Sequence, residues 1–444
     1  MQEDQDDGTG VAADADSKRA PGPLRGEWGS RPVLGVRADR VAAAAAIAIA
    51  AALLLCGYEF MRSVSTSLFI DAYGARNLPL VMAVGPMLTL ALLYIYGRLL
   101  SVTGPRAAIL LTSAFSAAVI LGCFFGIRAG VKSATVVLYG FREAYIVLLV
   151  EQIWSFINST LRVGEGARLN GPVCGIASLG AIAGGLLVRR FAVEVGSVNL
   201  LLVAAGSFIP TAGFAIAAYQ VAGEPQPAPA EAHGRQGHLG LRTLVHNPLL
   251  WRLAVLIALT QVVSTVADLQ FNRYVETAFP HKDLRTQWFG GFYAVLNAGS
   301  AVCQFIAAPL LLALVPHRLI HLGIPLLHLG MAAGVFAYPG LWTAAGCYLG
   351  FKVLDYSLFR AVKELLYIPL SFDARFRAKE VIDAFVYRAA KGATSAGIAG
   401  VGLVVVLPMA VFPVLITAAL LGWLMVVLQL MRVARDTVGP QRAA

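Results

Sequence analysis

The sequence predicts an all-α polytopic membrane protein with about twelve transmembrane helices in two halves of about six. The 444 residues are 58% apolar, and their mean hydropathy is +0.71. Only 14% of the residues are charged, whereas soluble domains average about 25%. Apolar runs of roughly 20 residues, the length that crosses a bilayer, recur along the chain and are interrupted once by a longer polar segment.

The apolar runs and the polar segment define the organisation of the chain. Residues 220–250 are rich in Pro, Gly and Ala with scattered charges, a composition typical of a flexible linker. This predicts an N-terminal half at 41–219, a cytoplasmic linker at 220–250 and a C-terminal half at 251–431. The expected spans lie near residues 41–60, 78–97, 107–127, 134–157, 171–190, 198–219, 251–270, 287–314, 319–338, 341–362, 380–403 and 407–430.

Both ends of the chain are polar. Residues 1–40 open with the acidic MQEDQDD and lack the short apolar core of a cleaved signal peptide. We therefore expect a disordered cytoplasmic tail at 1–40 and a second cytoplasmic tail at 432–444.

The basic residues predict the orientation of the protein in the membrane. Most of the residues behind the net charge of +10 lie between spans, where an excess of Arg and Lys marks cytoplasmic loops. The bias places both termini in the cytoplasm, although Arg128, Lys132, Arg189 and Arg190 fall on the other side. We therefore attribute the charge to membrane orientation and expect no nucleic-acid partner.

The turn GRLLSVTGPR, from Gly97 to Arg106, joins the second and third expected spans. Its Gly97, Gly104 and Arg106 resemble the loop between helices two and three of the major facilitator superfamily, although Ser101 stands near the place of that family's usual Asp. Together with the linker between two sets of spans, this resemblance implies a major facilitator-like 6+6 pseudo-repeat. In that fold the two halves rock about a site near the bilayer midplane.

Charged and polar side chains inside the spans are the candidates for a solute site. A charge at membrane depth costs about 2.5–3.5 kcal/mol on insertion scales, and residues 354–397 are especially rich in charges. Their structural interpretation is a set of interhelical ion pairs. Their functional interpretation is a binding site formed by Arg62, Glu143, Asp268, Lys363, Arg388 and Lys391.

A second group of polar residues follows Glu143 along the same span. Trp154 and Asn158 are four residues apart, so they lie near one face of a helix, and with Gln152 they are candidates to line a cavity. The structural alternative for Trp154 is an anchor at the membrane interface.

Motifs of enzymes and metal sites are missing from the sequence. The five cysteines lie singly in apolar segments, without a CxxC or a histidine spacing that suits a metal. GxSxG, HExxH and Walker patterns are also missing. We therefore expect no metal, no cofactor and no enzymatic activity.

The segment FRAVKELLYIPLSFDARFRAKEVID, residues 359–383, resembles the nucleotide transporter family, the ATP/ADP translocases of plastids and obligate intracellular bacteria. Lys391 with Gly392 resembles the Gly-Lys-Ser-Gly element that follows there. The resemblance implies a divergent bacterial-type member in the bacterial inner (plasma) membrane.

The resemblance also implies roles for individual residues. Lys363 matches the lysine of the family's tenth helix, and Asp268 stands where the seventh-helix region has glutamate. Glu143 is the nearest counterpart of the fourth-helix glutamate, with Arg142 in the alternative register. Arg62 matches the first-helix arginine, but the lysine expected three residues later is Ser65.

The leading hypothesis is a secondary transporter that exchanges nucleotides or related phosphorylated anions. Arg62 and Lys363 would face each other and bind the anionic group, Glu143 and Asp268 would balance these charges or accept a coupling proton, and Arg388 and Lys391 would contribute from the eleventh span. We expect a monomer in the lipid bilayer whose partner is a small anionic solute, with nucleotides among the candidates.

Two alternatives remain. Because phosphate recognition depends on paired cations, Ser65 in place of a lysine favours another organic anion or an amphiphile, with proton coupling. An alternative of a different class is a membrane receptor or scaffold that does not transport.

Overall fold

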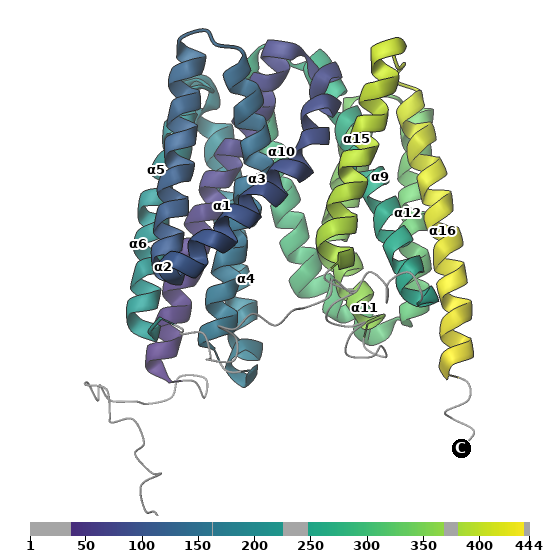
Figure 1. Cartoon of the computed structure of the whole chain (residues 1–444). Helices are drawn as coiled ribbons and strands as arrows, with labels where there is room; N and C mark the ends of the chain where they lie inside the picture. The colour runs from purple at the N-terminus through teal and green to yellow at the C-terminus, as the bar shows by residue number, and fades with distance from the viewer. Residues whose placement is uncertain (1–36, 162, 225–246, 368–380, 439–444) are drawn as a thin grey trace, which may run out of the picture.

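The computed structural model describes residues 37–161, 163–224, 247–367 and 381–438, and every element in these ranges is helical (Figure 1). Most of the predicted tail at 1–40 and of the linker at 220–250, the basic loop with Arg375, Arg377 and Lys379, and residues 439–444 lie outside the described residues. The predicted spans fall on described helices, but α1 (Ala38–Tyr73) continues thirteen residues beyond its predicted end, and α4 (Val163–Val195), α9 (Pro248–Ala278) and α16 (Val411–Val438) each extend eight residues beyond theirs at one end.

The N-terminal half is built from long apolar helices joined by short turns. They are α1 (Ala38–Tyr73), the 3₁₀ turn η1 (Ala75–Asn77), α2 (Leu78–Arg128), α3 (Ser133–Thr160), α4 (Val163–Val195), α5 (Leu200–Gly206) and α6 (Phe208–Ala222).

The helix α2 consists of two arms. Its 51 residues would extend about 75 Å if straight, far more than the roughly 30 Å of a bilayer core. Gly104 has φ 76° and is followed by Pro105, and the chain turns there because glycine adopts this left-handed backbone without a Cβ clash. The two arms correspond to the expected spans at 78–97 and 107–127.

The C-terminal half contains three π-helical segments. Its elements are α9 (Pro248–Ala278), α10 (Lys282–Val302), η2 (Cys303–Ala307), α11 (Ala308–Leu314), α12 (His317–Ala337), α13 (Leu341–Leu354), η3 (Asp355–Phe359), α14 (Arg360–Leu365), η5 (Val381–Val386), α15 (Tyr387–Val404) and α16 (Val411–Val438). The segments η2, η3 and η5 are π-helical, a form that occurs often at functional sites.

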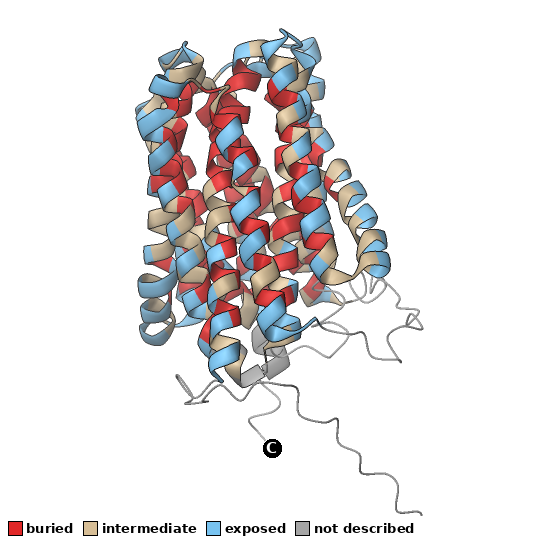
Figure 2. Cartoon of the chain, turned by 90° about the vertical axis from the view of Figure 1, so that its left-hand side faces the viewer, coloured by how far each residue is buried: buried red, intermediate tan, exposed pale blue. Residues whose placement is uncertain are grey.

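The predicted fold class is confirmed. Within the described ranges, nine helices are long and apolar enough to cross a membrane, and the two-armed α2 is one of them. The expected spans at 341–362 and 380–403 correspond to α13–η3–α14 and η5–α15, whose apolar runs are interrupted by charges. Figure 2 shows buried residues gathered between the helices and exposed residues on their outer faces.

The two halves meet through reciprocal helix pairs. The fifth span of the N-terminal half, α4, packs along the second span of the other half, α10. The second span of the N-terminal half, the first arm of α2, packs along the fifth span of the other half, α15, where Gly392 faces Pro86. This reciprocity is what a 6+6 pseudo-repeat produces.

Polar contacts join the halves at the end of the bundle opposite the start of α1 and the end of α16. The Ser197 hydroxyl lies 2.8 Å from the Thr286 hydroxyl and donates to Asp283 Oδ1 at 2.5 Å. The Ser67 hydroxyl donates to the Lys282 carbonyl oxygen at 2.6 Å. These contacts close the bundle at this end, which we call the closed end.

Glycines allow α4 to approach α1 closely. A Cβ at Gly180 would lie 2.1 Å from the Ala52 carbonyl oxygen, and one at Gly184 would lie 2.5 Å from that of Cys56. Gly180 and Gly184 are four residues apart, as in the small-xxx-small pattern of packed membrane helices. The two backbones are therefore in direct contact.

We expect Gly180→Ala to destabilise the protein, because α1 and α4 must separate to admit even a methyl group, and overpacking costs about 1–3 kcal/mol. Thermal unfolding of the purified protein measures the effect. Gly175→Ala on the same helix is the matched control, since no atom lies within 4 Å of a Cβ there. Equal melting temperatures for the two variants would contradict this account of the packing.

Candidate functional site

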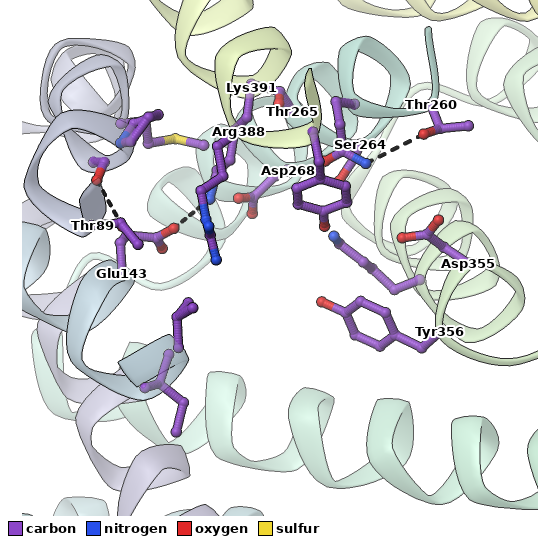
Figure 3. Close-up of a pocket in the computed structure, with 18 of the residues that line it drawn as sticks. Thr89, Glu143, Thr260, Ser264, Thr265, Asp268, Asp355, Tyr356, Arg388 and Lys391 are labelled. Carbon is purple, nitrogen blue, oxygen red and sulfur yellow. Dashed lines mark hydrogen bonds and ion pairs between the residues drawn. The ribbon is translucent and has the colours of Figure 1, made fainter. Parts of the chain in front are cut away.

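A cavity of about 530 Å³ lies between the two halves. Its walls come from α1, α2 and α3 on one side and from α9, α10, α13, η3, α14, η5 and α15 on the other. Figure 3 shows Glu143 facing Arg388 and Lys391 at one side of the cavity, with Asp355 and Tyr356 at the other. The cavity therefore draws its polar groups from both halves.

Cations outnumber carboxylates among the described residues of the lining. The five carboxylates are those of Glu143, Asp268, Asp355, Glu364 and Asp383, and the seven cationic side chains are Arg62, Arg142, Lys352, Arg360, Lys363, Arg388 and Lys391. All six predicted binding residues lie in this lining.

Several of these charges lie at one depth. Arg62, Glu143, Asp268, Lys352 and Lys391 are ten to thirteen residues from the ends of α1, α3, α9, α13 and α15 that face the closed end. At 1.5 Å per residue this is about 15–20 Å, near the middle of a bilayer core of about 30 Å. The helix lengths thus place the charges at mid-depth.

Glu143 connects the halves through two cations. Its Oε1 accepts a hydrogen bond from Arg142 Nη2 at 2.5 Å, and its Oε2 accepts one from Lys391 Nζ across the cavity. Arg142 is 5% exposed and also donates from Nη1 to the Arg62 carbonyl oxygen at 3.3 Å. A single carboxylate thus balances one cation from each half.

Arg142 reaches from α3 to the side chain of Ser65 on α1. Its Nη1 lies 3.4 Å from Ser65 Oγ and 2.5 Å from Thr66 Oγ1 on α1. The guanidinium of Arg142 therefore reaches the position where the resemblance implies a lysine, from a different helix.

Arg62 reaches from α1 to α10. Its guanidinium carbon lies 3.6 Å above the centre of the Tyr293 ring, a cation–π contact, and Nη1 lies 3.9 Å from Glu59 Oε1. Glu59 is 2% exposed and accepts a hydrogen bond from Asn297 Nδ2 at 2.9 Å. Stacking holds the guanidinium plane against the C-terminal half.

Lys363 lies farther from the closed end than Arg62. It follows the mid-depth Lys352 by eleven residues, on α14, and its Nζ is 2.6 Å from Asp383 Oδ1 and 3.8 Å from Glu364 Oε1. Lys363 and Arg62 line the same cavity at different depths, whereas Lys352 and Lys391 lie near the depth of Arg62.

The two remaining predicted binding residues also lie on the C-terminal wall. Asp268 Oδ1 accepts a hydrogen bond from Asn272 Nδ2 at 2.8 Å. Arg388 is half-buried on α15, one turn before Lys391.

The predicted second group lies elsewhere. Gln152, Trp154 and Asn158 are not among the residues that line the cavity. Gln152 is 3% exposed and its Nε2 donates to Thr112 Oγ1 at 3.0 Å, Trp154 packs against the core of the N-terminal half, and Asn158 is exposed. Their faces of α3 point away from the cavity, since helix spacing alone does not say which face is inward.

Sequence reasoning missed the tyrosines. Six of them line the cavity: Tyr58, Tyr139, Tyr293, Tyr348, Tyr356 and Tyr387. A usable signal was present, because Tyr58, Tyr348 and Tyr387 each precede a cavity cation by four residues, the spacing that places two side chains on one helix face.

Comparisons with known proteins identify the fold. No protein-family model matches the sequence, and no curated protein matches it significantly, so the resemblance to the nucleotide transporter family is not confirmed. Solved transporters are similar in structure across nearly their whole length.

A bacterial homologue of the iron transporter ferroportin, in an inward-facing state, has a TM-score of 0.65 at 15% identity, over 88% of this chain and 98% of its own. The nucleoside transporter NupG has a TM-score of 0.62 at 10% identity, over 87% and 99%. A bacterial homologue of the human lysosomal transporter Spinster, inward-facing and unoccupied, has a TM-score of 0.57 at 14% identity, over 90% and 99%. At these identities the similarity shows the fold, and this chain has the all-helical 6+6 fold of major facilitator-type transporters.

Proposed function

We propose that this protein is a secondary transporter that moves a small organic anion across the membrane by alternating access. The observation that carries the proposal is the mid-depth cavity between the halves, whose lining, among the described residues, contains seven cations and five carboxylates. Charges at membrane depth are costly and mark solute pathways, and an excess of cations suits an anionic solute.

Alternating access requires a bundle that opens at one end while the other is closed. The halves are joined at the closed end through Ser197, Asp283 and Thr286, and the cavity extends away from that end as far as Lys363. Two of the similar solved transporters are described as inward-facing, which supports the proposal that this structure represents one of the two conformations of an alternating-access cycle. From the distribution of Arg and Lys we infer that the termini, and the end beside them, face the cytoplasm.

Nucleotides and related phosphorylated anions are the first candidate solutes. The volume of about 530 Å³ lies in the usual range of pockets for small ligands, about 300–1,000 Å³. Tyrosine faces suit a planar ring, and NupG, which shares the fold, is a nucleoside transporter. The ion-paired states of Lys363 and Lys391 favour the second candidate, an organic anion with fewer charges than ATP.

Exchange follows from the charges in the cavity. An empty site leaves cations incompletely paired, and a buried charge without its partner is unfavourable. The halves should therefore reorient more readily around a bound anion than around an empty cavity.

We expect the protein, in liposomes loaded with unlabelled solute, to take up the same labelled solute faster than empty liposomes do. The panel is AMP, ADP, ATP, benzoate and, as neutral controls, adenosine and benzamide. Counterflow with at least one anion and none with its neutral analogue would support the proposal. Equal uptake into loaded and empty liposomes for every member would reject exchange, and binding without any flux would favour a receptor.

A further inference from the structure

Lys352 differs from the other two lysines of the cavity in having no carboxylate partner. It is 7% exposed on α13 and lines the cavity at mid-depth. Among the described residues, its ammonium makes no hydrogen bond and lies within 4 Å of no carboxylate. Lys363 pairs with Asp383 and Lys391 pairs with Glu143, so an anion can approach Lys352 without displacing a carboxylate from it.

Aromatic rings surround the Lys352 ammonium. Its Nζ lies 5.0 Å from the centre of the Tyr356 ring and 5.9 Å from that of Tyr348, within the roughly 6 Å range of cation–π attraction. These contacts stabilise the charge but accept no conventional hydrogen bond, so the three N–H donors of the ammonium stay available for a ligand.

The tyrosines offer hydrogen-bonding groups as well as faces. Tyr348, Tyr356 and Tyr387 line the cavity, and their hydroxyls make no hydrogen bond within the described part of the chain. Tyr348 is held by stacking on Phe292, with ring centres 5.8 Å apart and planes 3° from parallel. Tyr356 is 39% exposed, so its ring can meet a solute.

The turn of π-helix after Lys352 brings these groups together. Asp355 and Tyr356 are the first residues of η3, and Figure 3 shows both side chains on the same wall of the cavity, opposite Glu143. Tyr356 follows Lys352 by four positions, so the two side chains lie on the same side of the span, and the Lys352 ammonium is 5.0 Å from the centre of the Tyr356 ring.

We infer that Lys352, with the tyrosine hydroxyls around it, is the subsite for the anionic group of the solute. The class of solute is an organic anion in which one carboxylate or phosphate is joined to a planar ring, directly or through a sugar, with the ring against Tyr348 and Tyr356. This inference rests on the proposed function and replaces Lys363 with Lys352 as the lysine that meets the anion.

Ligand-induced thermal stabilisation of the purified full-length protein tests the subsite. The probes are AMP with its neutral analogue adenosine, and benzoate with its neutral analogue benzamide. Comparing AMP with benzoate shows whether the site prefers a phosphate or a carboxylate, and comparing each anion with its analogue shows whether the charge is needed for binding. We expect at least one anion to bind and its neutral analogue to bind at least about tenfold more weakly, since a charge-assisted hydrogen bond is worth about one to two powers of ten in affinity.

Three variants locate the charge. Lys352→Gln should weaken binding of that anion by about tenfold or more, Lys352→Arg should restore most of it, and Lys363→Gln should weaken it less than Lys352→Gln does. Without ligand, Lys352→Gln should melt close to the parent protein, because the lysine has no ion pair or hydrogen bond with the described residues to lose. A melting temperature far below that of the parent would indicate a structural role for Lys352 instead.

Other outcomes overturn the inference. These are unchanged affinity in Lys352→Gln, an equal loss in Lys363→Gln, or no binding by either anion. Counterflow that persists in Lys352→Gln with unchanged affinity would reject the subsite while leaving the transport function intact. Binding that depends on Lys352 without counterflow would reject transport while leaving the subsite intact.

Discussion

Oxidation of a variant that carries Ser197→Cys and Thr286→Cys is expected to abolish transport, and reduction is expected to restore it. The two hydroxyl oxygens lie 2.8 Å apart across the boundary between the halves, and both residues are buried at the closed end. Disulfide formation requires Cβ atoms about 3.5–4.5 Å apart. Because the two hydroxyl oxygens are in hydrogen-bond contact, the Cβ atoms that carry them lie near this range. Because alternating access requires this end to open, a covalent link there should stop the cycle rather than slow it.

The experiment is made in a background in which the five native cysteines are replaced by alanine. Exchange in proteoliposomes is measured with the solute found in the counterflow assay, before and after oxidation and again after reduction. The two single-cysteine variants and the cysteine-free parent should be insensitive to the oxidant. Full exchange by the cross-linked protein would show that the closed end does not open during transport.

The fold was predictable because its signals are local. The length of each apolar run is enough to predict a membrane span. Gly104 followed by Pro105 indicates the turn inside α2. The charged candidates were found for the same reason, since a charge in an apolar run is visible wherever the helix finally lies.

The sequence did not predict which of the cavity lysines is free to bind an anion, because this depends on which helices pack together. Lys352 and Lys363 lie on one span and look equivalent in sequence. Only the folded structure shows that Asp383, on η5, pairs with Lys363, and only the position along α13 places Lys352 near the depth of Arg62. The same limit explains why Gln152 was placed in a cavity that its face of α3 does not reach.

Replacement of Glu143 by Gln is expected to lower transport at least about tenfold and to lower the melting temperature. Glu143 accepts hydrogen bonds from Arg142 and Lys391, so its removal leaves two cations without their shared carboxylate. Breaking a buried pair in this way costs about 3–5 kcal/mol, and the lower value applies here because the Glu143 and Lys391 side chains are 20% and 26% exposed to the cavity.

A matched control is available on the surface of α4. Glu194 forms an ion pair with Arg190 four residues away, and both side chains are more than half exposed. Exposed pairs contribute about 0–1 kcal/mol, so Glu194→Gln should melt and transport like the parent protein. A similar loss in both glutamate variants would mean that the effect of Glu143→Gln does not come from its buried partners.

Lys391→Gln should be milder than Glu143→Gln, and this asymmetry distinguishes the arrangement from a simple ion pair. Without Lys391, Glu143 keeps the hydrogen bond from Arg142 at 2.5 Å, so a carboxylate and a guanidinium still balance each other. Without Glu143, neither Arg142 nor Lys391 keeps the carboxylate that they share. The double variant completes a cycle whose coupling energy, typically about 0.5–3 kcal/mol for contacting residues, measures the link between the halves. Equal losses in the two single variants, with no coupling, would place Arg142 outside the cluster and leave Glu143 and Lys391 as independent contributors to transport.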